Sequence, residues 1–270
     1  MKKLLALLLA LSMVFCFAAC GGNEAPEGND GTEPQQNVNS DLAYIQEKGK
    51  LVVGVTIYEP MDYKDENGDW TGFDAEYARL VAQELGVEAE FIVIDWDNKE
   101  FEVESKNIDC VWNGMTITDK LKKSMDITDP YVWNAQVVVM NKDEVTKYTT
   151  AESIKDLSFA VETGSAGETY AKENGLEYTA LQYQSDALLE VKSGKADACI
   201  IDITMANSMT GDGTSYADLA KGVVLTEEFY GVGCRKGSDL CTKINEITDE
   251  LVANGKLTAL AEKYELTLAE

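Results

Sequence analysis

The sequence predicts an α/β protein built as two lobes, and three features indicate this. Continuous apolar runs, of which residues 51–55 are the first, fit strands buried on both faces of a parallel sheet. Such runs lead through Gly-containing turns into segments with helical spacing. Residues 105–112 and 193–201 are also alike, since both pass from a helix end through Lys and Asp into an apolar strand. This repeat suggests two similar lobes, with chance likeness between two common connections as the alternative.

The first part of the chain predicts one α/β unit. Its strand at 51–55 ends in a loop, residues 56–63, at the edge of an open sheet where ligands bind. The other elements expected before residue 97 are a helix at 41–48, a hairpin turn at 64–69, a helix at 73–85 with an apolar face, and a strand at 87–95 that ends at Trp96.

Residues 107–131 predict a strand, a glycine turn and a helix. The apolar run 110–112 breaks at Asn113 and Gly114, and an N-cap pattern restarts at Thr118. Such a turn presents backbone N–H groups and the hydroxyl of Thr116 at a helix N-terminus, where a polar or anionic group can be held. An ordinary strand-to-helix turn without a ligand is the alternative.

The second part of the chain repeats this scheme. A strand at 159–161 runs into a turn of small residues, 162–167, ahead of a helix, and a strand at 200–202 ends in the carboxylate of Asp202. The remaining expected elements are a strand at 137–140, a helix at 186–192 capped by Ser185, a returning strand at 225–234 and a helical segment at 239–264.

Three motifs carry a resemblance to a known family. Residues 114–118 read Gly-Met-Thr-Ile-Thr, residues 126–131 read Asp-Ile-Thr-Asp-Pro-Tyr, and residues 72–74 read Gly-Phe-Asp. The chain from about Gly49 to Tyr264 thereby resembles the polar amino-acid-binding proteins of ABC importers, solute-binding family 3. The resemblance implies a type II periplasmic-binding-protein fold, two Rossmann-like lobes joined by two hinge strands. Lobe 1 would comprise residues 41–135 and 229–270, and lobe 2 residues 136–228.

The resemblance also implies a function and a set of ligand contacts. A monomer would capture a small solute by closing its lobes and deliver it to an ABC permease. Asp202 would accept the ligand's ammonium, with a helix N-cap as its alternative role. The full set of expected ligand-binding residues is Tyr58, Glu59, Trp96, Trp112, Asn113, Gly114, Thr116, Leu121, Glu162, Ser165 and Asp202.

These expected contacts have different physical roles and different alternatives. Trp96 and Tyr58 would form aromatic walls, although either could instead belong to a lobe core. Trp112 could fill strand core or line the pocket, since its N–H needs a partner. Asn113, Gly114 and Thr116 match the family's contacts to the ligand carboxylate.

The chain departs from the family pattern where the ligand's carboxylate is held. The position of the usual carboxylate-binding Arg is Leu121, a usual Thr is Ala166, and Glu162 adds a carboxylate. We therefore expect a small amine-bearing, amino-acid-like solute without a free α-carboxylate, because an unpaired buried charge costs about 2–5 kcal/mol. The alternatives are an ordinary amino acid held by Lys120 or Lys122, a dehydratase-type enzyme on the same fold, and a ligand sensor that docks on a separate receptor.

The N-terminus predicts export and a membrane anchor. Two lysines, an apolar run and Ala18-Ala19-Cys20 resemble a lipoprotein signal peptide over residues 1–20, which would leave Cys20 as a lipidated N-terminus. A plain secretory signal or a short transmembrane helix is the alternative. Residues 21–40 contain almost no large apolar side chain and predict a flexible tether. The expected location is extracytoplasmic, lipid-anchored to the cell membrane.

Composition excludes several other classes. A net charge of −25 argues against nucleic acid as a partner. The chain contains no histidine, which removes His-dependent catalysis and most transition-metal sites, so neither a metal nor a cofactor is expected. Of the six cysteines, Cys110 and Cys199 are expected to be buried thiols, whereas Cys234 and Cys241 could pair.

Overall fold

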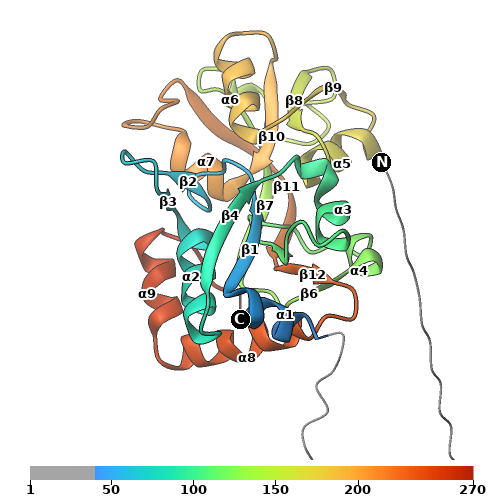
Figure 1. Cartoon of the computed structure of the whole chain (residues 1–270). Helices are drawn as coiled ribbons and strands as arrows, with labels where there is room; N and C mark the ends of the chain where they lie inside the picture. Colours follow the sequence, from blue (N-terminus) through green and yellow to red (C-terminus); the bar gives the residue numbers. More distant parts are fainter. Residues whose placement is uncertain (1–39, 270) are drawn as a thin grey trace, which may run out of the picture. The chain divides into compact units, whose positions relative to one another are not determined.

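The computed structural model describes residues 40–269, which belong to one compact unit (Figure 1). The predicted signal peptide, lipidated Cys20 and residues 21–39 of the predicted tether lie outside the described residues. Within the described part of the chain, no helix is both long enough and apolar enough to cross a membrane.

The first of two five-stranded sheets belongs to lobe 1 and has the order β4-β1-β5-β12-β6. The central β1 pairs in parallel with β4 and β5, whereas β12 runs antiparallel to β5 and β6. Four of the five residues after Lys50 in β1 are buried, as the continuous apolar run predicts. The strands are β1 (Lys50–Val55), β4 (Glu88–Val93), β5 (Cys110–Val111), β6 (Met125–Ile127) and β12 (Gly233–Arg235), with a hairpin of β2 (Tyr63–Lys64) and β3 (Trp70–Thr71) beside them.

Helices accompany this first sheet. The Ser40 hydroxyl caps the first of them by accepting from the backbone N–H of Ala43, and Gly49 ends it in the left-handed conformation with φ 71°. The helices are α1 (Asp41–Lys48), α2 (Phe73–Glu84), α3 (Lys99–Glu104), α4 (Leu121–Ser124), α8 (Asp239–Ala253) and α9 (Lys256–Lys263), with a 3-10 turn η1 (Trp96–Asn98).

The second sheet belongs to lobe 2 and has the order β11-β7-β10-β8-β9. As predicted, a small-residue turn joins β8 to α5, and Ser165 caps that helix. The elements are β7 (Val132–Asn141), β8 (Ser158–Glu162), β9 (Glu177–Leu181), β10 (Ala198–Asp202), β11 (Leu219–Tyr230), α5 (Ala166–Glu173), α6 (Gln184–Lys192), α7 (Ile203–Met209) and a 3-10 turn η2 (Val145–Lys147).

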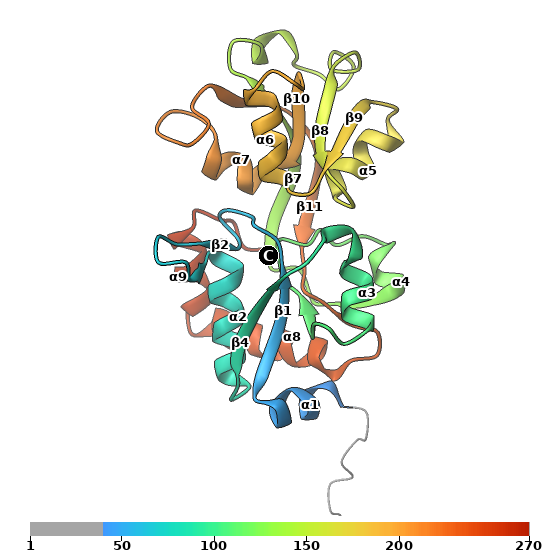
Figure 2. The same ribbon diagram turned by 45° about the horizontal axis from the view of Figure 1, so that its top comes forward.

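Two long strands, β7 and β11, connect the lobes (Figure 2). They pair antiparallel from Val132 opposite Tyr230 to Asn141 opposite Leu219. Tyr230 also forms a bridge to Thr116 of lobe 1, so the base of this ribbon is tied to the glycine-turn segment. These strands give the polypeptide route that a hinge between the lobes requires.

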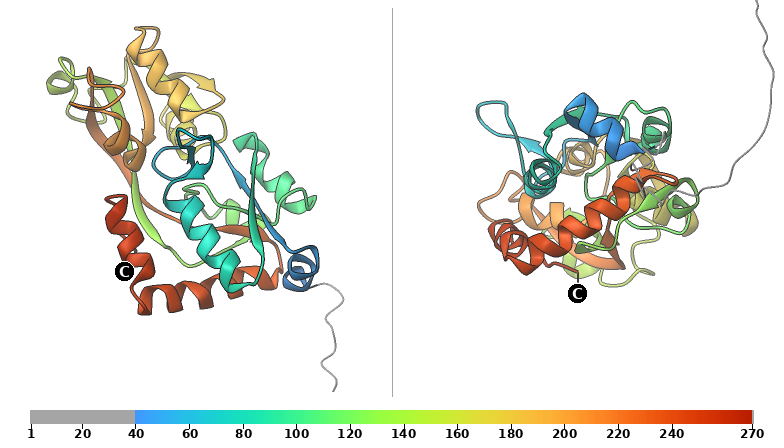
Figure 3. Two further views of the ribbon diagram at one scale, coloured as in Figure 1. Left: turned by 60° about the vertical axis from the view of Figure 1, so that its left-hand side comes forward. Right: turned by 60° about the horizontal axis from the view of Figure 1, so that its bottom comes forward.

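Three expected elements have different boundaries in the structure. The predicted strand 225–234 is two strands, β11 and β12, separated at Gly231, where a Cβ would come within 2.7 Å of Ile127. The predicted terminal helical segment is two helices, α8 and α9, which meet at an angle where Gly255 has φ 79° (Figure 3). Helix α6 begins at Gln184 with Tyr183 as its N-cap, in place of the predicted Ser185.

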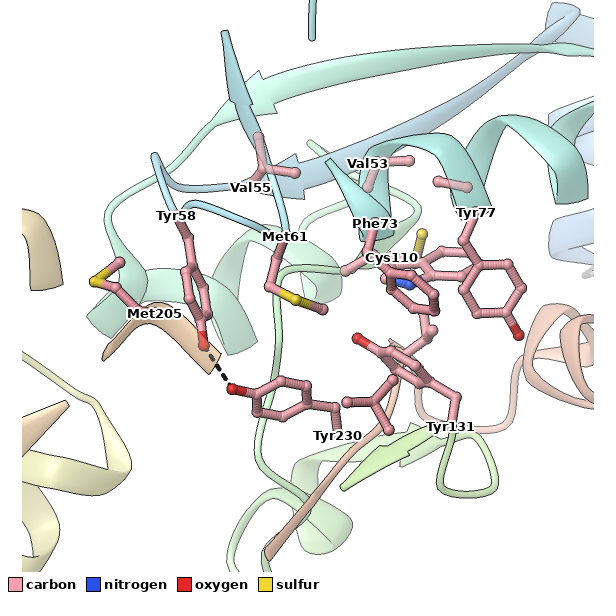
Figure 4. Packing of buried hydrophobic residues seen from close by; sticks show 14 of the residues in the cluster. Val53, Val55, Tyr58, Met61, Phe73, Tyr77, Cys110, Tyr131, Met205 and Tyr230 are labelled. Carbon is pink, nitrogen blue, oxygen red and sulfur yellow. Dashed lines mark hydrogen bonds between the residues drawn. The ribbon is translucent and has the colours of Figure 1, made fainter. Parts of the chain in front are cut away.

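Buried aromatic rings form part of the core under the glycine turn (Figure 4). Tyr77 and Trp112 pack edge to face with ring centroids 4.6 Å apart, and Tyr131 lies 5.7 Å from Tyr77. The expected burial of Cys110 and Cys199 is confirmed. Cys234 and Cys241 are also buried, and all four are free thiols.

Candidate functional site

A cavity of about 710 Å³ is lined by residues of both lobes. All but two of the sequence-predicted ligand residues line it. They come from the loop after β1, η1, the glycine turn, α4, the turn after β8 and the end of β10, so the carboxyl ends of strands supply much of the site. The predicted residues that line the cavity are Tyr58, Trp96, Asn113, Gly114, Thr116, Leu121, Glu162, Ser165 and Asp202.

Trp112 and Glu59 are the two exceptions. Trp112 is fully buried and packs against Tyr77, so the pocket role considered for it is corrected to a core role. Glu59 lies outside the cavity lining and accepts a hydrogen bond of 3.2 Å from Ser208 of lobe 2. The sequence left both roles open for Trp112, because the short strand β5 ends before it and strand alternation does not indicate which way its ring points.

The turn at Asn113 and Gly114 is held by buried acids. The Asn113 amide donates to Asp62 at 2.7 Å, and its oxygen accepts from the Thr56 hydroxyl at 2.7 Å. The Gly114 N–H donates to Asp74 at 2.6 Å. These groups were expected to contact a ligand carboxylate, but the protein's own groups already occupy the Asn113 side chain and this N–H.

Asp74 was noticed in the sequence only as part of a motif. In the structure it is completely buried in the cluster beneath the turn, where it also accepts from the Tyr131 hydroxyl at 2.8 Å. Burial raises the pKa of Asp74 to about 7, although the bonds from Gly114 and Tyr131 oppose that shift.

Asp202 lies at the floor of the cavity among side-chain amides. Its Oδ1 accepts from Gln136 at 2.8 Å and also from Asn134, and its Oδ2 accepts from Gln184. It occupies the N-cap position of α7 without making a capping hydrogen bond, so the alternative assigned to it from sequence does not describe its side chain. Burial, and then the charge of Glu228, raise the pKa of Asp202 to about 7.

Glu162 and Lys99 form a second buried charged group in the cavity. Burial and the nearby Asp202 raise the pKa of Glu162 to about 8, while Lys99 opposes the shift. Lys99 donates to the carbonyls of Trp96, at 3.0 Å, and of Gly164, at 3.1 Å, so it bridges the two lobes. Burial lowers the pKa of Lys99 to about 8. This lysine is positioned by backbone carbonyls and faces an acid.

The cavity residues that sequence reasoning did not single out include Lys99, Gln184 and Glu228. Glu228 accepts from the Thr116 hydroxyl at 2.8 Å, which uses another donor expected to serve a ligand carboxylate. Nothing in the local sequence singles out these residues, because each is defined by a partner distant in the chain. In the structure Glu227 is exposed and Glu228 is half-buried, as the alternation of side chains along β11 requires.

Leu121 and Trp96 contribute apolar side chains to the cavity lining and belong to one hydrophobic cluster. Leu121 is thus at the cavity wall, where the family pattern leads one to expect an Arg. Of the two lysines considered as substitutes, Lys120 lines the cavity, whereas Lys122 does not.

Tyr58 closes the cavity next to the hinge. Its hydroxyl lies 2.5 Å from that of Tyr230 in β11 (Figure 4). It also lies 2.5 Å from that of Thr204 in lobe 2. Thr204 and Tyr230 are themselves 2.9 Å apart, so the three hydroxyls form a closed triangle. The aromatic wall expected at Tyr58 is therefore also a contact between the lobes.

Comparison with known proteins identifies related chains. The sequence is 32% identical to the arginine-binding extracellular protein ArtP of Bacillus subtilis (strain 168), over 98% of each chain. It is 30% identical to the L-cystine-binding protein TcyJ of Escherichia coli (strain K12), over 83% of this chain and 85% of TcyJ. The crystal structure of the ancestral amino acid-binding protein AncCDT-1, a precursor of cyclohexadienyl dehydratase, matches with a TM-score of 0.77 and 33% identity, over 83% of this chain and 99% of that one.

The family profile described as bacterial extracellular solute-binding proteins, family 3, matches residues 51–267. That range contains both sheets except for the first residue of β1, together with the connecting strands and the whole cavity lining. The fold resemblance drawn from the three motifs is confirmed. The chain belongs to the bacterial extracellular solute-binding proteins of family 3.

Proposed function

We propose that this protein binds a small amine-bearing solute that lacks a free α-carboxylate, and passes it to an ABC permease. One observation carries the proposal: the groups expected to hold a carboxylate are replaced or already occupied. Gly114 N–H donates to Asp74, and Thr116 donates to Glu228. Leu121, which we assign to the position of the family's Arg, lines the cavity with an apolar side chain.

Acidic side chains, which would attract a ligand's ammonium group, line the cavity. Glu162 and Asp202 are almost completely buried there, and Glu228 lines the same floor. Lys99 is the only buried lysine among the described residues, and two backbone carbonyls hold its ammonium. A ligand ammonium would therefore find acceptors in a low-dielectric site, whereas a ligand carboxylate would meet repulsion.

The Leu121→Arg variant tests this specificity directly. If the missing guanidinium excludes ordinary amino acids, restoring it should improve their affinity by about 30-fold or more, because a buried charge regains its partner. Leu189→Arg makes the same chemical change at an exposed position on α6 and should alter nothing. Unchanged amino-acid affinity in Leu121→Arg, measured by calorimetric titration, would contradict the proposal.

An ordinary amino acid held by Lys120 is the second candidate, since this lysine does line the cavity. On that account Lys120→Met should abolish amino-acid binding, whereas our proposal expects amine binding to persist in this variant. Lys122→Met is the matched control, because that lysine lies outside the lining.

An enzymatic role has one observation in its favour, namely that Glu162 has a pKa near 8 and so holds a proton at neutral pH. Incubating the protein with a cyclohexadienyl acid and following product by absorbance tests that role. Turnover that disappears in Glu162→Gln would support an enzyme; our proposal expects no turnover.

We further propose that the protein is a monomer held outside the cytoplasm by a lipid on Cys20. The lipoprotein-like signal, Ala18-Ala19-Cys20, supports this. Cys20→Ala should release the chain from the membrane fraction while leaving solute binding unchanged.

A further inference from the structure

The floor of the cavity contains a second carboxylate next to Asp202. Gln136 Nε2 donates to Asp202 Oδ1 and to Glu228 Oε1, at 2.8 Å in each case. Asn134 Nδ2 bridges the same two oxygens, and its bond to Glu228 is 2.6 Å. Asp202 lies at the end of β10 and Glu228 on β11, on either side of β7, which supplies both amides. The sheet therefore holds two acidic groups around one pair of amide nitrogens.

Glu162 brings a third acid to this floor. Its carboxyl group and that of Asp202 both neighbour the Gln184 side chain. When Asp202, Glu228 and Glu162 are all ionised, their three negative charges face the single positive charge of Lys99, which leaves a net charge of about −2. Buried charges of one sign are costly unless a partner of opposite charge is bound. Two positive charges bound at the floor would therefore balance the three acids in their ionised form.

Two buried oxygen atoms of the cavity also lack hydrogen-bond donors within the described part of the chain. Glu162 Oε1 and Thr226 Oγ1 are buried without a hydrogen-bond partner among residues 40–269. Both residues line the cavity, and Glu162 has an exposed fraction of 3%. Thr226 is two residues from Glu228 on β11 and so shares its face of the strand. Both atoms can accept, and buried acceptors are normally paired, so N–H donors at two places in a bound solute would satisfy them.

We propose that the solute is a dication, with one cationic nitrogen between Asp202 and Glu162 and a second, ammonium or guanidinium, at a subsite formed by Glu228 and Thr226. This inference rests on the proposed function and narrows it from amines to diamines and amino-guanidines. Trp96 and Leu121 supply the apolar wall for the carbon chain between the two charges. Glu228 is then the residue that sets the preference for two charges over one.

The experiment titrates the full chain by calorimetry with unbranched diamines of three to six carbons. Each is compared with the monoamine of the same length, and lysine and ornithine serve as carboxylate-bearing probes. We expect the best diamine to bind about tenfold or more tightly than its monoamine, which corresponds to one additional charge pair. Glu228→Gln should remove most of that preference by weakening the diamine alone.

Glu227→Gln is the matched control, because it makes the same charge change at the exposed neighbouring residue of β11. If Glu228→Gln fails to fold, Thr226→Val tests the same subsite and should also reduce the preference. Equal affinity for diamines and monoamines would overturn the second subsite and leave the proposed function standing. Binding of lysine or ornithine in preference to all amines would overturn the proposed function, and this inference with it.

Discussion

Single hydroxyl and carboxyl groups in this site act across the boundary between the lobes. Tyr58 joins lobe 1 to Thr204 of lobe 2 and to Tyr230 of the connecting ribbon, through bonds of 2.5 Å. All three residues are buried. A buried hydroxyl whose partner is removed costs about 1–3 kcal/mol, so this triangle contributes directly to holding the two lobes in contact.

Replacing Tyr58 by Phe tests that contribution at the residue scale. The ring and its packing remain, while Thr204 and Tyr230 keep only their bond to each other. We expect solute affinity to fall by about 5- to 100-fold, because lobe closure loses part of its free energy. Tyr63→Phe, at a partly exposed hairpin residue, is the control. Calorimetric affinity in Tyr58→Phe equal to that of the unmodified protein would contradict a role in closure.

For single residues, the sequence predicted which side chains reach the cavity better than it predicted the hydrogen bonds they make. Leu121, Glu162 and Asp202 do reach the cavity, since motif spacing fixes where a residue lies on its element. The donors of Asn113 and Gly114 were misread as free, because Asp62 and Asp74 occupy them from another part of the chain. Glu228 and Lys99 were not predicted for a similar reason. A charged residue becomes a candidate for the site only when it is buried, and the local sequence does not specify its burial.

At the scale of elements, one buried arginine ties three pieces of lobe 1 together. Arg235 on β12 donates to Asp41 of α1 at 3.0 Å. It also donates to the carbonyls of Val103, at the end of α3, and of Ile108, at 2.8 and 2.9 Å. Since β12 follows the connecting strand β11 in the chain, this anchor fixes the end of the ribbon to lobe 1.

Arg235→Met should therefore destabilise the protein while leaving the cavity chemistry unchanged. Removing one partner of a buried ion pair costs about 3–5 kcal/mol, and here two carbonyls lose their donor as well. Lys236→Met, at the neighbouring and largely exposed lysine, should cost about 0–1 kcal/mol. Urea unfolding gives both values. A loss in Arg235→Met no larger than that in Lys236→Met would refute the anchoring role.

The boundaries of elements also show what the sequence could not specify. The breaks at Gly231 and Gly255 divide stretches whose apolar periodicity is otherwise continuous. At Gly231 the reason is tertiary, since Ile117 and Ile127 leave no space for a side chain there. Periodicity reports the type of an element, whereas such breaks depend on packing partners that are distant in sequence.

For the whole molecule, the buried acids predict how stability changes with pH. The pKa values of Asp74 and Asp202 are raised to about 7 and that of Glu162 to about 8, each mainly by burial. Between about pH 4 and these values the folded state binds protons that the unfolded chain has released. The stability of the empty protein should therefore fall as pH rises from 5 to 8.

Urea unfolding of the empty protein at pH 5, 6, 7 and 8 measures this slope. Glu162→Gln should reduce the dependence of the unfolding free energy on pH between pH 5 and 8, because it removes one of the titrating groups. A cationic solute should oppose this loss of stability at higher pH, because it binds the ionised form of the acids. Its affinity should therefore increase between pH 5 and 8. Lys99 and Glu228 are the other charged groups that face this part of the cavity. Stability that rises with pH, or a slope unaffected by Glu162→Gln, would be inconsistent with buried protonated acids.

The two-lobed arrangement was the most predictable feature of the whole molecule, because repeated strand-turn-helix units and three motifs all indicated it. Ligand identity was the least predictable. It depends on a charge balance summed over Glu162, Asp202, Glu228 and Lys99, which come from four elements and meet only in the folded protein. The apolar side chain of Leu121 was visible in the sequence, whereas the hydrogen bonds that Gly114 and Thr116 make within the protein were not.

The central claim is that this cavity accepts an amine and rejects an α-carboxylate. The most direct measurement is the thermal shift of the full chain in the presence of amino acids and, at equal concentration, their decarboxylated amines. A ligand at 100 times its Kd adds about 2.7 kcal/mol of stability, which is readily detected. We expect shifts with amines alone, and largest with those that carry two positive charges. Shifts with ordinary amino acids and none with their amines would contradict the account.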